Sequence, residues 1–237
     1  MGKGGATLMR SYKFPTGAGF VAGLALITLL LYFSVTGPSF GMWFYSWQYD
    51  VNDTYNVVNM QPSDLHEVTR HMIRYMQGHY DRDVGLQIVT LVGGQPREFF
   101  SPIEIRHMVD VYDLFQIGFV IRNVAAIIAI IAIVYSVLAR RHLRQVFTGL
   151  QIAVVTVFAA LAILAIVIAA NWHHAFVVFH EIFFDNDYWI LDRRVDLLIN
   201  IVPYDFFITL SAVIGGFFAA GLAAIFGVAT VLKRRFS

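Results

Sequence analysis

One short stretch of the sequence places a histidine and two aspartates on the same face of a helix. His107, Asp110 and Asp113 are three and six residues apart, and residues three or four apart are neighbours on a helix surface. Asp110 can accept a hydrogen bond from a ring nitrogen of His107, which would fix the histidine tautomer and raise its basicity. Such a histidine is suited to general acid–base chemistry, although a helix with solvated charges has the same pattern.

A second concentration of polar residues lies between 171 and 205. It contains three histidines and six acidic residues among many aromatic side chains, directly after a long apolar stretch. Polar groups at this density next to a membrane surface exceed what solubility requires. His180 is the central candidate, because it can approach His107 if both segments lie on the same side of the membrane. Two histidines with carboxylates nearby suffice for general acid–base catalysis at neutral pH.

The same residues also offer a set of metal ligands. His107, His180, Glu181 and Asp185 carry the nitrogen and oxygen atoms that zinc commonly takes. However, the sequence has no HExxH motif or similarly close pair of ligands, so we expect no metal. It also lacks GxSxG, which disfavours a serine nucleophile.

The composition is that of a membrane protein. Of the 237 residues, 58% are hydrophobic and 14% are charged, whereas soluble domains carry about 25% charged residues. The mean hydropathy of +0.64 excludes a disordered chain, and the formal net charge of +1 argues against a nucleic-acid binder. The sequence contains no cysteine, which excludes disulfides, thiolate metal sites and a cysteine nucleophile.

Four apolar stretches are long enough to cross a hydrocarbon core of about 30 Å. The predicted transmembrane helices are 14–35, 114–139, 146–170 and 206–232. The two long segments between them are 36–113, expected as a small α+β domain, and 171–205, expected as a catalytic loop.

The placement of charge predicts how these helices are oriented. All sixteen acidic residues lie in 36–113 and 171–205, whereas the other flanks of the spans carry basic residues only. The positive-inside rule therefore places both termini and the 140–145 connection in the cytoplasm and the acidic segments outside. The expected fold class is an α-helical polytopic membrane protein with four transmembrane helices and a small α+β extracytoplasmic domain inserted between the first and second. The basic residues of these flanks are Lys3, Arg10, Lys13, Arg140, Arg141, Arg144, Lys233, Arg234 and Arg235.

Arg122 is an ionisable residue inside a predicted span. It lies eight residues after 114, where a charge is costly unless it is paired or hydrated. It can snorkel, pair with a carboxylate of the outer domain, or hold a substrate carbonyl, and pairing is favoured. The four tryptophans lie near span ends, which favours an aromatic interface belt over substrate stacking. They are Trp43, Trp47, Trp172 and Trp189.

The 36–113 segment carries its own secondary-structure signals. Ser63 and Asp64 predict the start of a helix that stops at Gly78. Residues 84–92 and 97–100 predict a hairpin around a turn at 93–94. Ser101 and Glu104, with Pro102 between them, are typical of a capping box that opens the helix carrying His107.

Two motifs resemble those of a known family. Residues 98–100, 105–111 and Leu114 resemble the "FF…HMxDVKxL" signature of the lipoprotein intramolecular transacylase (Lit) family, and residues between 179 and 207 resemble its second signature. The four-span layout with one insert agrees with this family over nearly the whole chain. Tyr112 departs from the pattern, because the family usually has lysine there. The second signature is matched by residues 179–184, Asn186, Asp187, Trp189, Leu191, Asp192, Asp196, Leu198, Ile199, Pro203, Phe206 and Phe207.

The resemblance implies an acyltransferase of the bacterial plasma membrane whose substrates are diacylated lipoproteins. Such enzymes move the sn-2 acyl chain of the S-diacylglyceryl cysteine onto the α-amine of the same cysteine, which gives the lyso-form lipoprotein. The amine is the nucleophile, so the protein must supply proximity and proton transfer and needs no cofactor. His107 and His180 match the paired histidines of the family and would be the acid–base pair.

The remaining candidate residues would assist this pair. Asp110 would orient one histidine, and Glu181 or Asp185 would orient the other. Arg122 or Asn186 would polarise the ester carbonyl as an oxyanion donor. We expect a monomer in contact with membrane lipid and no nucleic-acid partner. The alternative functions are a metal-dependent membrane ester hydrolase and a non-enzymatic envelope-binding protein.

Overall fold

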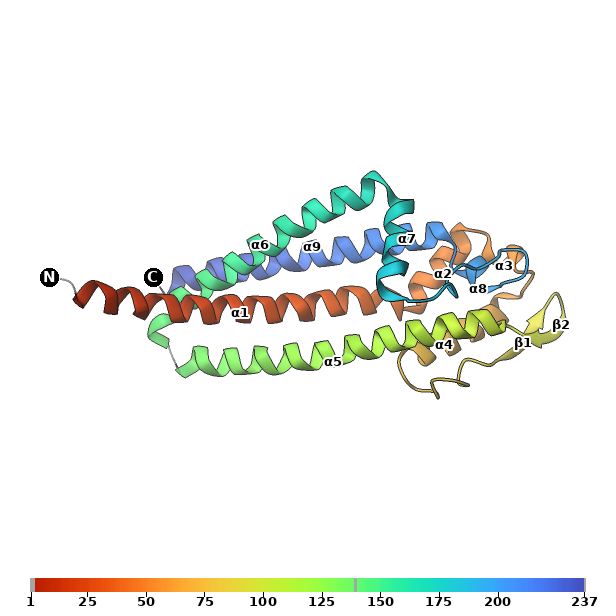
Figure 1. The fold of residues 1–237 in the computed structure, drawn as a ribbon, viewed down its shortest axis with the longest axis horizontal. Helices are drawn as coiled ribbons and strands as arrows, with labels where there is room; N and C mark the ends of the chain where they lie inside the picture. Colours follow the sequence, from red (N-terminus) through yellow and green to blue (C-terminus); the bar gives the residue numbers. More distant parts are fainter. Residues whose placement is uncertain (1–2, 139, 237) are drawn as a thin grey trace. The chain divides into compact units, whose positions relative to one another are not determined.

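Four long apolar helices dominate the computed structural model, which describes residues 3–138 and 140–236, with side chains for 14–138 and 141–236. They are α1 (Lys3–Ser39), α5 (Pro102–Leu138), α6 (Leu143–Ala170) and α9 (Tyr204–Arg235) (Figure 1). By length and composition each can cross a membrane, α1 over Phe14–Ser39 and the others over their whole length. Ala139, the last residue of the predicted second span, lies outside the described residues.

Shorter elements connect these helices. A two-stranded sheet precedes α5 in the chain, and two short helices follow α6. The helical architecture with four candidate spans and one small sheet confirms the predicted fold class. The connecting elements are α2 (Met42–Val51), α3 (Thr54–Val57), α4 (Pro62–Met76), β1 (Val89–Val92), β2 (Gln95–Glu98), the 3₁₀ turn η1 (Arg140–His142), α7 (Trp172–Phe183) and α8 (Leu198–Ile201).

The chain divides into two compact units. Unit 1 contains Met1–Ser34, Val120–Ala170 and Gly215–Ser237, and unit 2 contains Val35–Phe119 and Asn171–Ile214. Helices α1, α5 and α9 contribute residues to both units. Each unit has its own buried hydrophobic cluster.

The core of unit 2 is built on the amphipathic helix α4. Its residues Leu65, Val68, Met72 and Met76 follow helical spacing and are buried. Tyr49 of α2 packs into the same cluster, and its hydroxyl is 2.8 Å from the Thr69 hydroxyl, so the buried phenol has a polar partner. Burying one large apolar side chain stabilises a fold by about 1.5–3 kcal/mol, so this cluster can hold the short elements of unit 2 together.

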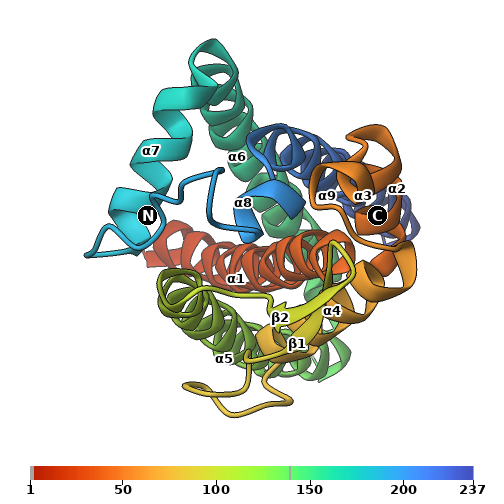
Figure 2. The ribbon, with the colours of Figure 1, turned by 90° about the vertical axis from the view of Figure 1, so that its right-hand side faces the viewer.

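The hairpin differs from its prediction in the length of the first strand and in the position of the second, which is Gln95–Glu98 instead of 97–100. The turn at Gly93 and Gly94 is confirmed, since both residues have positive φ and Val92 pairs with Gln95. The first strand begins at Val89 instead of 84, because residues 83–85 are hydrogen-bonded to Asp81. The Asp81 side chain accepts from the amides of residues 83 and 84, and its carbonyl accepts from the Gly85 amide. The second strand ends at Glu98, because the next two residues turn into the core. Figure 2 shows the hairpin beside α4.

Unit 1 brings α1 and α6 into backbone contact through glycines. A Cβ atom at Gly149 would collide with the Thr16 carbonyl and the Phe20 amide, and one at Gly19 would collide with the Val146 carbonyl. Small residues permit such close approach of helices in a membrane, where dispersion contacts are the main attraction. The close approach of α1 and α6 therefore requires glycine at positions 19 and 149.

We expect Gly149→Val to destabilise the protein by about 1–3 kcal/mol, the usual cost of overpacking, because α1 and α6 must separate. The measurement is the thermal unfolding midpoint of purified protein in detergent. Gly227→Val is the matched control, since a Cβ at Gly227 meets nothing within 4 Å. Equal midpoints for the two variants would refute the close contact.

Candidate active site

Helix α5 begins in unit 2 with the capping box that the sequence predicted. The Ser101 amide donates to Glu104 Oε2 at 2.5 Å, and the Glu104 amide donates to Ser101 Oγ at 3.4 Å. Glu104 is fully buried, and its other oxygen accepts a 2.5 Å hydrogen bond from the Leu198 amide. One carboxylate therefore fixes the first turn of α5 and joins it to the segment that begins α8.

Asp196 forms a second link between the same two segments. Its Oδ1 accepts a 2.9 Å hydrogen bond from the Ser101 hydroxyl, and its Oδ2 accepts one of 2.8 Å from the Asp192 amide. The Asn200 side-chain amide donates to the Asp196 carbonyl at 2.9 Å. These bonds tie the start of α5 to residues more than ninety positions later, and His107 lies one turn inside that helix.

The two candidate histidines lie side by side within unit 2. The ring centroids of His107 and His180 are 6.2 Å apart, with an interplanar angle of 33°. Phe184 contacts both, with ring centroids 5.4 Å from His107 and 5.6 Å from His180. The structure thus brings together the residues whose approach the sequence favoured, in an aromatic environment.

The ring nitrogens of the two histidines differ in their partners. His180 Nδ1 is 2.7 Å from the Phe176 carbonyl, and because a carbonyl only accepts, Nδ1 carries a hydrogen and Nε2 presents the lone pair. His107 Nδ1 is buried and makes no hydrogen bond to any of the described residues. A buried polar atom without a partner is unusual in folded proteins, and a catalytic role is one explanation for it.

Burial favours the neutral form of His180. Its exposed fraction is 7%, and desolvation lowers its pKa below the ordinary histidine value, against the smaller raising effect of the Phe176 carbonyl. Trp189 stacks on the imidazole at 4.6 Å and Phe176 lies 4.3 Å away, both measured between ring centroids. A neutral imidazole with a free Nε2 is the form required of a general base.

We expect His180 to titrate below the value of about 6.5 seen for a histidine in a model peptide. As the pH falls from 7 toward 6, His180 is expected to gain less proton than a solvated histidine does, because burial lowers its pKa in the folded state. The measurement is an NMR titration of ring-labelled full-length protein in detergent, with the signal assigned by its loss in His180→Gln. A midpoint at or above 6.5 would contradict the burial argument.

Asp110 does not make the hydrogen bond that we expected to His107. Its Oδ2 accepts instead from the Asn186 side-chain amide at 2.9 Å, and Asn186 Oδ1 accepts from the Tyr188 amide at 3.0 Å. Asp110 is thus bonded to the loop after α7, which also carries Trp189. The helical spacing was compatible with a contact along α5, but a loop amide from a distant segment supplies a closer donor.

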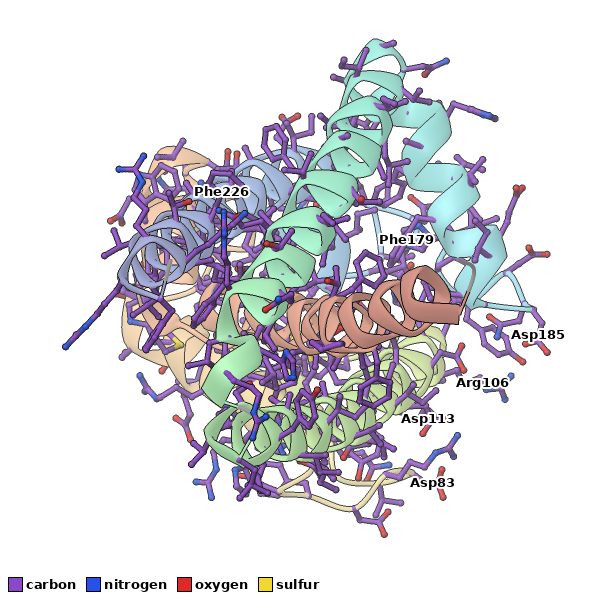
Figure 3. The ribbon with its side chains drawn as sticks, turned by 90° about the vertical axis from the view of Figure 1, so that its left-hand side faces the viewer. Asp83, Arg106, Asp113, Phe179, Asp185 and Phe226 are labelled. Atoms are coloured by element: carbon purple, nitrogen blue, oxygen red, sulfur yellow. The ribbon has the colours of Figure 1, made fainter. Side chains whose placement is uncertain are left out.

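The other acidic candidates also differ from expectation. Within the described part of the chain, the hydrogen-bond partner of the His180 ring is a backbone carbonyl, and Glu181 and Asp185 are exposed. Figure 3 shows the labelled Asp185 side chain directed outward. Asp113 forms an ion pair with Arg82, with the two hydrogen bonds at 2.6 and 2.9 Å. Backbone groups in α7, which sequence spacing does not reveal, replace the expected carboxylates.

Arg122 belongs to unit 1. Its guanidinium donates to the Tyr32 hydroxyl at 3.1 Å and to Asn123 Oδ1 at 2.9 and 3.1 Å, and it lies 5.1 Å from the centre of the Tyr32 ring. These uncharged partners differ from the carboxylate that we favoured, and the sequence of unit 1 contains no acidic residue. For 3–138 and 140–236, no three His, Asp or Glu side chains are grouped so that they could hold a metal ion.

The sequence model of the lipoprotein intramolecular transacylase Lit family matches residues 20–207. The chain belongs to the Lit family. It is therefore an acyltransferase of a membrane-integral family, as the motifs around His107 and His180 indicated. None of the curated proteins matches this chain.

Three solved structures of the membrane-integral lipoprotein intramolecular transacylase Lit from Bacillus cereus are similar to this Lit-family chain. The first is 22% identical, with a TM-score of 0.76, over 93% of this chain and 97% of that one. A variant with a histidine replaced by arginine is 20% identical, with a TM-score of 0.77, over 98% of both chains. A variant with the histidine replaced by alanine has 20% identity and a TM-score of 0.74, over 98% of this chain and 100% of that one. At these identities the similarity shows a shared fold.

Two features of the Lit-family site were not foreseen from the sequence. Trp189 stacks on His180, whereas we interpreted it as a residue of an interface belt. Tyr112, which replaces the usual lysine, packs 5.1 Å from Tyr75 in the core cluster of unit 2. The aromatic run from 176 to 189 was the available signal for the first, because its residues flank a histidine on one short helix and the following loop.

Proposed function

We propose that this chain transfers the sn-2 acyl group of the S-diacylglyceryl cysteine of a bacterial lipoprotein to the α-amine of the same cysteine. The ester C–O bond breaks, an amide C–N bond forms, and the product is the N-acyl, S-monoacylglyceryl lyso form. The nucleophile is the amine of the substrate, which accords with a chain that has no cysteine. Family membership supports a lipoprotein substrate.

The contact between His107 and His180 carries this proposal. His180 Nε2 takes the proton that the amine loses as it attacks the ester carbonyl. His107 gives a proton to the departing glyceryl oxygen and regains one from His180, so both imidazoles return to their starting states. The 6.2 Å separation of the ring centroids is compatible with exchange between them through one water.

The partly buried polar groups near the pair have supporting roles in this proposal. Asp110 positions Asn186, whose side-chain amide has a second hydrogen that can donate to the developing oxyanion. The sequence also suggests Arg122 as a donor, and that residue belongs to unit 1. The acidic segments 36–113 and 171–205 face outward and both termini lie in the cytoplasm, as the positive-inside rule favours. The protein acts as a monomer in contact with membrane lipid.

The test is mass spectrometry of the N-terminal peptide of a model lipoprotein. It is co-expressed with the protein in a bacterial host that lacks N-acylation enzymes. We expect the intact peptide mass to be unchanged, while fragmentation shows one acyl chain on nitrogen and one on glycerol. A metal-dependent hydrolase would instead remove a whole acyl chain and lose activity with a chelator. A binding protein would leave the fragmentation pattern unchanged, and either result would reject the proposal.

A further inference from the structure

Unit 1 contains an apolar cavity between its four helices, with a volume of about 510 Å³. Its walls include Ala22 of α1, Ala129 and Ile133 of α5, and Phe147 of α6. The polar side chain in the lining is that of Ser136, whose hydroxyl donates to the Ala132 carbonyl at 2.7 Å. Among the described residues, the lining therefore offers dispersion contacts and a single hydroxyl that is already bonded, which suits a hydrocarbon chain. Its volume falls in the range of about 300–1,000 Å³ that is common for ligand sites.

Exposed basic residues lie close in the chain to lining residues of this cavity. Leu143 and Phe147 of α6 both line it, and the exposed Arg144 lies three residues before Phe147 on the same helix. Arg141 is exposed two residues before Leu143. The sequence of unit 1 contains no acidic residue, so no carboxylate of the same unit neutralises these charges.

The apolar walls and the nearby arginines together match the two parts of an anionic lipid. A hydrocarbon tail fits the cavity walls, and an anionic headgroup fits the adjoining arginines. Basic pockets between transmembrane helices are known to bind the headgroups of anionic lipids, and each arginine near a membrane surface contributes about 1 kcal/mol of attraction to them. Zwitterionic lipids with the same tails do not gain this attraction between headgroup and arginine.

We propose that this cavity binds one acyl chain of an anionic phospholipid, whose phosphate is held by Arg144 and Arg141. The lipid is a structural ligand of unit 1. None of these residues belongs to the group assigned to acyl transfer, so the site is additional to the reaction that the histidines perform. Occupation of the cavity would hold the ends of α5, α6 and α9 together.

The experiment titrates delipidated full-length protein in detergent with dioleoylphosphatidylglycerol or dioleoylphosphatidylcholine, and bound lipid is counted by native mass spectrometry. We expect one tightly bound phosphatidylglycerol, and an affinity ratio of the two lipids that falls about fivefold for each arginine removed. Equal affinity for the two lipids in the wild-type protein would overturn the proposal.

Two pairs of variants separate this site from general attraction. Arg144→Gln and Ala132→Phe remove a headgroup contact and fill the cavity, respectively. Their controls are Arg97→Gln, on the exposed strand β2, and Ala160→Phe, at an exposed position of α6 outside the cavity lining. We expect the first pair to weaken phosphatidylglycerol binding and the controls to leave it unchanged. If Arg97→Gln weakens binding as much as Arg144→Gln, the lipid recognises overall charge and the proposal is wrong. Folding of each variant is checked by its elution in size-exclusion chromatography.

Discussion

Replacement of His180 by alanine is expected to lower the rate of acyl transfer by about 10²–10⁴, the range that a positioned general acid–base group contributes. The variant removes the Nε2 lone pair that is directed away from the Phe176 carbonyl. The measurement is single-turnover conversion of a diacylated lipopeptide by purified protein. His180→Gln tests the same point with less change in volume, and it too should be slow, because an amide does not accept a proton at neutral pH.

His107→Ala is expected to show a similar loss, and the double variant little more than either single one. Residues that act as one unit show strongly non-additive effects, because removal of one member already stops the proton transfer. His173→Ala is the matched control, since His173 lies on the same helix α7 and is exposed. Independent, multiplying losses for His107 and His180 would contradict the proposed exchange of a proton between them.

Replacement of Glu104 by leucine is expected to destabilise the protein by about 2–6 kcal/mol. The buried carboxylate accepts hydrogen bonds from the amides of Ser101 and Leu198, and each donor left without a partner costs about 1–3 kcal/mol. Leucine has similar volume, so the loss reports the missing acceptors and not a cavity. The measurement is the thermal unfolding midpoint in detergent.

Glu104→Gln provides the graded comparison, because glutamine keeps one acceptor oxygen of the two. We expect an intermediate midpoint and a measurable loss of transfer rate at temperatures where the protein remains folded, since the start of α5 positions His107. Glu98→Gln, on the exposed strand β2, is the control. A Glu104→Gln protein with unaltered midpoint and rate would show that the link between α5 and α8 is dispensable.

Much of the helical architecture followed from the sequence because apolar length and capping chemistry are local signals. The candidate spans and the capping box at Ser101 and Glu104 needed no knowledge of distant residues. The predicted ends of the two hairpin strands were wrong, because other interactions compete with strand pairing. The side chain of Asp81 and the burial of Phe99 and Phe100 compete with strand pairing, and neither effect is visible in the alternation of side chains.

The partners of the candidate site residues were harder to predict, because they come from other segments or from the backbone. Spacing on α5 suggested Asp110 for His107, yet Asp110 bonds Asn186, seventy-six residues later. The carboxylates beside His180 in the sequence are exposed, and a helix carbonyl takes their place. Neighbours in sequence are poor guides here, because successive residues of a helix point in different directions.

The hydrogen bond between His180 Nδ1 and the Phe176 carbonyl orients the imidazole only while one turn of α7 is folded. In many acid–base sites a separate side chain orients the imidazole, and that support survives when a helix end frays. Here the ring is held by the carbonyl four residues earlier on α7, which ends at Phe183. Transient opening of this turn would release the ring at a much lower free-energy cost than global unfolding. Catalytic competence should therefore decline on heating before the fold itself is lost.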